Sequence, residues 1–341
     1  MKTKTITVIF LTAAIVFSMS AAIFAQAINI SNEITYTRKF FSDNAIQSTS
    51  FEQNMAYLAT GVNYYMEFEP YFSGDQSVQG LAKDILTAAA TGKAEEAETT
   101  AKIASLTGKQ SDDGAFGTVE DTAWAIIALK TVSAAYDSEK AVHYLVDKKN
   151  DDGSISDSAD DLSAKVLDTS IVLTAFSLYI ADQSVYDAAT DAVNFIYNSH
   201  NDSRTFGDGT AETLAKVMTA LVDVSQSVND DIWNIPSLLL SFKNDDYSYK
   251  NTADGEPSVL TTATALIALD AAGNGDSIYK RLMEDGTLKR FDIKDYLSTI
   301  IIYAVLALFS LVFWGYIMFF RKKNTRTLEQ AKREKEERLD M

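Results

Sequence analysis

An eight-residue pattern that recurs four times constrains this chain more than any other feature. In each copy the second residue is small, the fifth is large and apolar, the seventh is alanine and the eighth is large again. The copies are TAWAIIAL from Thr122, TSIVLTAF from Thr169, LAKVMTAL from Leu214 and TATALIAL from Thr262, with starts 47, 45 and 48 residues apart. A weaker copy, LAKDILTA, starts at Leu81. Apolar residues at helical spacing with periods of this length are typical of stacked helical repeats.

Each repeat also contains a second helical stretch. SEKAVHYLVDKK, YDAATDAVNFIYNSH and DDIWNIPSLLLSF all carry apolar residues at helical spacing, and no part of this region shows convincing strand alternation. The predicted unit is therefore a helical hairpin that stacks on its neighbour, and five such units are visible. The segment Ser50–Phe68 either supplies one more helix or leaves the array open.

The loops before the repeated helices are acidic and rich in glycine, as in KQSDDGAFG and KNDDGSIS. Thr118 with Asp121, and Ser158 with Asp161, have the spacing of a capping box, and Pro257 fits the first turn of a helix. Acidic residues in these positions are also favoured by the helix dipole. These features predict turns that end one hairpin and start the next, rather than an active site.

A calcium loop is the sharper alternative for NDDGSISDSADD, and its spacing fails. With Gly153 at the sixth position of an EF-hand, Lys148 falls on the first ligand and Ala159 on the last. The chain has no cysteine, so disulfides, thiolate nucleophiles and cysteine metal sites are excluded. The sequence therefore predicts no metal site and no cofactor.

The two ends of the chain predict a membrane-anchored protein. Residues 1–27 combine a basic start, an apolar stretch and an Ala-Gln-Ala cleavage site, as in a secretory signal peptide; an uncleaved anchor is the alternative. The uncharged run Leu297–Phe320 is long enough to cross a bilayer, so a transmembrane helix is predicted over 296–320. Residues 321–341 contain eight Lys/Arg and five Asp/Glu. Under the positive-inside rule this tail is cytoplasmic and the preceding domain is extracellular.

Charge limits the partners of the outer domain. Residues 28–295 contain 42 Asp/Glu and only 20 Lys/Arg. A surface this acidic argues against binding nucleic acid over a broad area. The expected partner is a small ligand or another membrane or extracellular protein.

The stretch QSDDGAFG, Gln110–Gly117, followed by an alanine-rich helix, resembles the repeats of the prenyltransferase and terpene-cyclase superfamily. The resemblance covers about residues 78–290 and implies an α/α toroid, in which inner helices surround a cavity and outer helices wrap them. The expected fold is all-α, with a toroid of about five to six helical hairpins after an N-terminal helical segment at 28–77, plus one C-terminal transmembrane helix. By this likeness the repeated helices are the inner ones.

The superfamily's catalytic motifs do not carry over. Protein prenyltransferases hold zinc with a cysteine among the ligands, and this chain has only His143 and His200 in addition to its carboxylates. Squalene- and hopene-type cyclases use a D-x-D-D motif, and the nearest string, DSADD at Asp157–Asp161, has the wrong spacing. The chain then resembles the binding toroids, such as cobalamin carriers, more than the enzymes. No catalytic residue is assigned.

The third, sixth and tenth positions of the repeated helices share one face and vary most between copies, which makes this face the predicted cavity wall. The residues chosen from it as candidate ligand-binding residues are Trp124, Thr174, Lys216, Thr219 and Asp223. A mostly apolar pocket with a few polar groups is typical of ligand sites. The alternative for Lys216 is that its side chain points to solvent.

The sequence thus predicts a single-pass surface protein that binds a small hydrophobic or cofactor-like ligand, or a partner protein, through its toroid. Two alternatives stay open: an extracellular enzyme acting on glycan or lipid, and a structural surface domain without a pocket.

Overall fold

The computed structural model describes residues 30–228 and 234–288, together with the single positions 310, 313, 314 and 333. The chain divides into two units, Met1–Leu288 and Lys289–Met341, and all the named helices and strands belong to the first.

The features predicted at the two ends of the chain fall almost wholly outside the described residues. The signal peptide at 1–27 lies outside them, and the span at 296–320 and the tail at 321–341 are represented only by single positions. Within the described residues, no helix is both long enough and apolar enough to cross a membrane.

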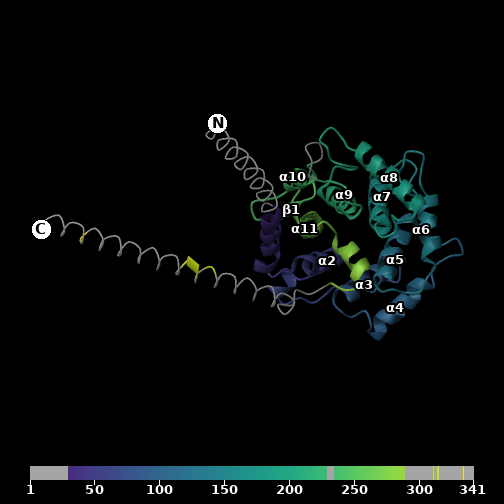
Figure 1. The fold of residues 1–341 in the computed structure, drawn as a ribbon, viewed down its shortest axis with the longest axis horizontal. Helices are drawn as coiled ribbons and strands as arrows, with labels where there is room; N and C mark the ends of the chain where they lie inside the picture. The colour runs from purple at the N-terminus through teal and green to yellow at the C-terminus, as the bar shows by residue number, and fades with distance from the viewer. Residues whose placement is uncertain (1–29, 229–233, 289–309, 311–312, 315–332, 334–341) are drawn as a thin grey trace. The chain divides into compact units, whose positions relative to one another are not determined.

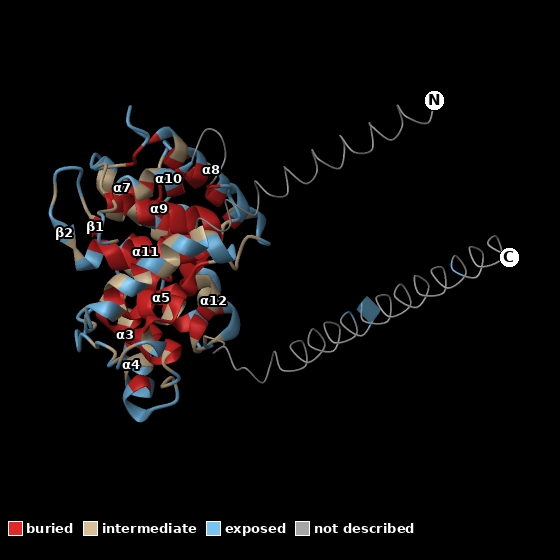
Figure 2. Cartoon of the chain, turned by 90° about the vertical axis from the view of Figure 1, so that its left-hand side faces the viewer, coloured by how far each residue is buried: buried red, intermediate tan, exposed pale blue. Residues whose placement is uncertain are grey.

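Six inner helices form a closed ring (Figure 1). They are α2 (Phe51–Thr60), α3 (Val78–Ala90), α5 (Val119–Thr131), α7 (Leu162–Phe176), α9 (Ala211–Asp223) and α11 (Val259–Asn274). Each packs against the next, and α11 returns to pack against α2. The segment Ser50–Phe68 therefore supplies the sixth inner helix and closes the ring. The inner helices also hold most of the buried residues, shown red in Figure 2.

A second layer of helices covers the ring. It consists of α4 (Ala97–Thr107), α6 (Ser138–Asp147), α8 (Gln183–Asn198) and the short α10 (Ile235–Leu240), each packed on the inner helix before it; a 3-10 turn, η1 (Val62–Tyr64), follows α2. The helical segment 30–43 covers α11, because Ile30 and Ile34 lie against Gly273. It is tied to the loop after α10 by an ion pair between Glu33 and Lys243.

The loops that lead into α5, α7, α9 and α11 share one hydrogen-bond pattern. In each, the amide of the first residue donates to the carbonyl of the fifth, and the amide of the fourth donates to the carbonyl of the first. The fourth residue has a positive φ in every case; these residues are Gly114, Gly153, Arg204 and Tyr247. The loops therefore act as repeated turns, as predicted.

A threonine at the start of the repeated pattern fastens three of these loops to their helices. The Thr122 hydroxyl accepts a hydrogen bond from the Phe116 amide at 3.0 Å, and Thr169 and Thr262 accept in the same way at 3.0 and 2.8 Å. In α9 this position is Leu214, so the bond has no equivalent there. The recurring threonine is thus a structural residue that holds a turn in place.

Two local predictions were wrong and one is confirmed. The capping box of Thr118 and Asp121 is present at the start of α5. At α7 the helix begins one residue after Asp161, which is itself the N-cap. Pro257 lies in strand β2 (Pro257–Ser258), which pairs antiparallel with β1 (Tyr249–Lys250) before α11 begins. Strands of two residues are too short to show the alternation that marks a strand in sequence.

The last described helix, α12 (Ile278–Asp285), does not join the outer layer. It contacts α3, α5 and α11, and Gly286 after it lies close to the carbonyl oxygen of Thr131 at the end of α5. Thr131 and Asp223, which α12 and the residues beside it contact, are the last residues of α5 and α9, so α12 lies at the end of the ring where these inner helices finish.

Candidate functional site

The ring encloses a cavity of about 260 Å³. Side chains from all six inner helices and from α12 line it. A cavity that draws on every repeat and lies at the centre of the ring is the natural candidate site of this fold, because ligand pockets usually lie where several elements converge.

Three aromatic side chains, named here the aromatic floor, pack together: Trp124 and Tyr279 line the cavity, and the buried Phe51 packs against both. Phe51, Trp124 and Tyr279 lie with ring centroids 5.5 to 6.1 Å apart, mostly edge to face. Such pairs contribute stability beyond the area that they bury. Tyr279 comes from α12, so this helix supplies part of the cavity floor.

The wall between floor and mouth is apolar with hydroxyl groups set into it. Ile171 and Ile267 provide apolar surface. The hydroxyls of Ser170, Thr219 and Thr264 each donate to the carbonyl four residues earlier in the same helix, at 2.7, 2.9 and 3.0 Å. Because their protons are already engaged, these hydroxyls can offer a ligand only acceptor lone pairs.

Two lysines line the cavity from opposite sides. Lys83 and Lys216 are each the sixth residue of their helix, α3 and α9, and these helices stand three places apart in the ring of six. The Lys83 ammonium lies 3.7 Å from Glu52 and over the rings of Phe51 and Trp124. Lys216 is exposed and makes no ion pair or hydrogen bond with any residue that the structure describes.

Two further carboxyls, Glu120 and Asp168, line the cavity. The Glu120 carboxylate accepts a hydrogen bond from the Gln79 amide at 3.1 Å. Asp168 accepts one from the Ser156 hydroxyl at 2.5 Å. Burial raises the pKa of the Asp168 carboxyl above its ordinary value against the effect of the Ser156 bond, and the charges of Glu120 and Asp157 raise it further.

Two buried carboxyls hold α12 in place. Asp223, at the end of α9, accepts hydrogen bonds from the Ser277 amide at 2.9 Å and hydroxyl at 2.8 Å. Asp270 of α11 pairs with Arg281 of α12. Burial raises the pKa of each carboxyl to about 6, although the bonds to Ser277 and the charge of Arg281 act in the opposite direction.

The structure brings four of the five predicted ligand-binding residues together. Trp124, Thr174, Lys216 and Thr219 line the cavity, and their role in binding stays a prediction. Asp223 is absent from the lining; it is the last residue of α9, and its carboxylate binds Ser277, the N-cap residue of α12.

Several lining residues were not predicted from the sequence, and for one of them, Lys83, the repeat pattern contains a signal. Lys83 is the third residue of the weaker repeat LAKDILTA, in the same column as Trp124 and Lys216. Extending the alignment to that copy would have found it. Tyr279 belongs to α12, which has no counterpart in the repeat, and no local pattern indicates its position.

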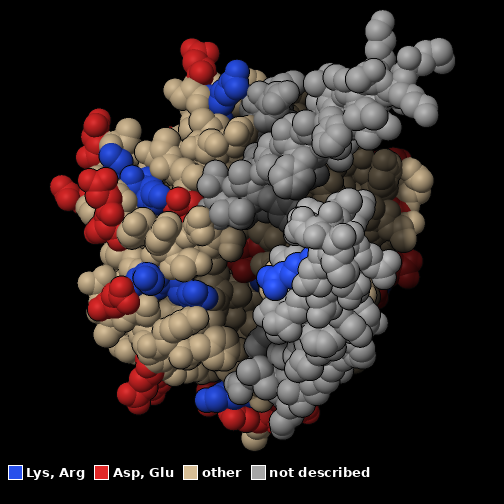
Figure 3. Space-filling view, turned by 60° about the vertical axis from the view of Figure 1, so that its left-hand side comes forward, with Lys and Arg blue, Asp and Glu red and all other residues tan. Residues whose placement is uncertain are grey.

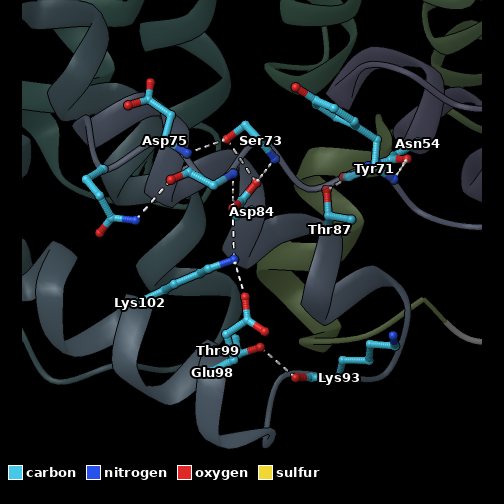
Figure 4. A network of polar contacts seen from close by, with 12 residues as sticks. Asn54, Tyr71, Ser73, Asp75, Asp84, Thr87, Lys93, Glu98, Thr99 and Lys102 are labelled. Carbon is cyan, nitrogen blue, oxygen red and sulfur yellow. Dashed lines mark hydrogen bonds and ion pairs between the residues drawn. The ribbon is translucent and has the colours of Figure 1, made fainter.

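A second, more polar hollow of about 500 Å³ adjoins the cavity and shares Glu52 and Lys83 with it. Its edge, the segment before α3, is fixed by the buried Asp84 (Figure 4). Asp84 accepts hydrogen bonds from the amides of Ser73 at 2.8 Å and Gly74 at 3.2 Å, and it pairs with Lys102 at 2.9 Å. This network ties the segment before α3, at the rim of the hollow, to α3 and α4.

The DSADD string and the two histidines, the residue types from which metal or acid chemistry is usually built, make local structural contacts here. Asp157 accepts from the Val119 amide at 2.7 Å, and Asp161 caps α7. His143 lies 3.7 Å from Asp182, and His200 contacts the Tyr197 carbonyl. Among the described residues, no three histidine or acidic side chains cluster as a metal site would require. On the surface shown in Figure 3, basic side chains are scattered among acidic ones rather than gathered into one patch.

Neither a protein-family model nor a curated protein matches this sequence. Among solved structures, the type II terpene cyclase MstE from Scytonema, in complex with its substrate geranylgeranyl dihydroxybenzoate, matches with a TM-score of 0.50 and 13% identity. The match covers 74% of this chain and 99% of that one. The fold is a terpene-cyclase-like α/α toroid. At this identity the likeness shows the fold alone, and function has to be argued from the cavity.

Proposed function

We propose that this protein is a non-catalytic surface toroid that binds a small, mostly apolar ligand in its central cavity. The observation that carries the proposal is the closed ring around a cavity of about 260 Å³, with an aromatic floor completed by α12. Ligand pockets are typically apolar, with a few polar groups that fix orientation, and the volume here suits a ligand smaller than most drugs.

The location is proposed from the sequence. The signal peptide at 1–27, the span at 296–320 and the basic tail at 321–341 support a single-pass protein of the cell membrane with the toroid outside.

A second candidate is an extracellular enzyme acting on glycan or lipid. Asp168 favours it, because a half-buried carboxyl with a raised pKa at a cavity is what acid catalysis requires. Against it, Asp168 is held by Ser156, and the string DSADD nearby is used for capping and turn contacts. The binding function therefore fits the described residues better.

Native mass spectrometry tests the binding function. The full chain is purified in lipid nanodiscs from its own cells, and the expected result is a discrete added mass. Thr264→Phe fills the cavity from α11 and should abolish that mass. Thr100→Phe is the matched control, because Thr100 is also a helical threonine bonded to the carbonyl four residues earlier, yet it lies exposed on α4.

An added mass that survives Thr264→Phe would place the ligand elsewhere and refute the proposal. A ligand that is released chemically changed after incubation would favour the enzyme instead.

A further inference from the structure

The cavity offers few hydrogen-bond donors, and this limits what it can hold. The wall hydroxyls of Ser170, Thr219 and Thr264 donate within their own helices, so they present acceptors. The Thr174 hydroxyl, which also lines the cavity, donates to the Asp223 carboxylate. Among the described lining residues, the donors left for a ligand are therefore the two lysines, the indole N–H of Trp124 and the hydroxyl of Tyr279.

Two of these donors are buried without a partner. Trp124 and Tyr279 are each only 8% exposed, and neither polar atom makes a hydrogen bond within the described chain. Neither polar atom is fully sealed from solvent, and both residues line the cavity, so each donor is open to water or to a ligand. Burial and the nearby carboxylates of Glu52 and Asp223 raise the pKa of Tyr279 well above its ordinary value, so its hydroxyl stays protonated.

The two lysines of the cavity differ in whether their charge is paired. Lys83 is balanced by Glu52, whereas Lys216 on the opposite side has no partner among the residues described. An ammonium beside an apolar wall attracts an anionic oxygen, and hydrogen bonds to charged groups are stronger than neutral ones.

The carboxyls that line the cavity set an upper limit on the ligand's charge. Glu52, Glu120 and Asp168 all line the cavity, so a head group with two or three negative charges would be repelled. A single charge faces less repulsion, since Glu52 is paired with Lys83 and Asp168 has a raised pKa.

Building on the proposed function, we infer that the cavity takes a singly charged anionic amphiphile. Its apolar body lies between the aromatic floor and the wall of Ile171 and Ile267, and its oxyanion binds Lys216. Acceptor atoms on the body find the donors of Trp124 and Tyr279.

A pair of fluorescent probes separates the charge from the body. 1-Anilinonaphthalene-8-sulfonate carries one sulfonate, and N-phenyl-1-naphthylamine has the same skeleton without it. Both are titrated onto the full chain in nanodiscs, with empty nanodiscs as background. Lys216→Gln should weaken binding of the sulfonate about tenfold, the loss of one charged contact, and that of the neutral probe less than twofold. Lys39→Gln, an equal charge change on the exposed face of segment 30–43, should change neither.

The outcomes distinguish the two proposals. If Thr264→Phe leaves both probes bound, the cavity is not their site and the proposed function fails. If it releases both, but Lys216→Gln weakens both equally or neither, the cavity binds ligands and the anionic class is wrong. Lys216→Arg, which keeps the charge, should retain the preference for the sulfonate.

Discussion

At the end of the ring where the inner helices begin, four loops repeat one hydrogen-bond pattern; at the other end a single helix, α12, lies across the opening. The first end depends on short-range contacts, each made several times. The second depends on two buried carboxyls: Asp223 reaches Ser277 at the start of α12 from 54 residues earlier, and Asp270 of the preceding helix α11 pairs with Arg281. The repeated loop accepts different residues at its fourth position, which is glycine in two loops and Arg204 or Tyr247 in the others. The α12 end relies instead on residues that occur only once.

The largest effect is expected at the repeated end, where a loop approaches its outer helix closely. Gly114 has φ +95°, and a Cβ there would lie 2.4 Å from the carbonyl carbon of Lys140. Gly114→Ala combines a left-handed alanine with a backbone clash, so we expect a loss of about 3–4 kcal/mol in the free energy of unfolding. Urea denaturation measures it.

Gly92→Ala is the matched control. Gly92 also has a positive φ, +76°, but a Cβ there would meet nothing within 4 Å. This variant should lose only about 1 kcal/mol, the conformational term alone. Equal losses in the two variants would show that the loop moves away from Lys140 without cost.

The contrast between the ends also explains what could be predicted from the sequence. The hairpins, the inner helices and the capping box of Thr118 depend on neighbouring residues and a period, which a sequence displays directly. The role of Asp223 depends on Ser277, 54 residues later, and on where α12 crosses the ring. The candidate site divides in the same way: Lys216 follows from the repeat column, whereas Tyr279 follows from tertiary packing alone.

A smaller effect is expected when Ser277, the N-cap residue of α12, loses its hydrogen bonds to Asp223. Asp223→Ala leaves the buried Ser277 amide and hydroxyl without acceptors, so we expect a loss of about 2–3 kcal/mol and faster hydrogen exchange confined to α12. Asp223→Asn keeps one acceptor oxygen and should lose less. If exchange instead rises around the whole ring, α12 is required for ring closure and the two ends are not independent.

The smallest expected effect is a difference between the two ends in how their contribution to the free energy of unfolding depends on pH. The carboxyls of Asp223 and Asp270 have a pKa of about 6 in the folded protein, above the ordinary value of 3.8, so the folded state binds their protons more tightly. Their stabilising contribution is complete below pH 4 and is lost as the pH rises through 6. Lowering the pH from 7 to 5 should therefore stabilise the protein by about 1 kcal/mol per carboxyl.

At the end formed by the repeated loops, lowering the pH destabilises the protein, and it does so in a lower pH range. Lys165 and Ser154 outweigh the effect of burial and lower the pKa of Asp152 to about 2, so its contribution is present above pH 4 and lost below it. In urea denaturation between pH 3 and 7, the Asp223→Asn/Asp270→Asn variant should lose most of the gain between pH 7 and 5, and Asp152→Asn should change only the acid limb. If the double variant still gains free energy of unfolding between pH 7 and 5, the gain comes from other carboxyls, and Asp168 is the first to replace. In that case α12 is not the element that acid stabilises.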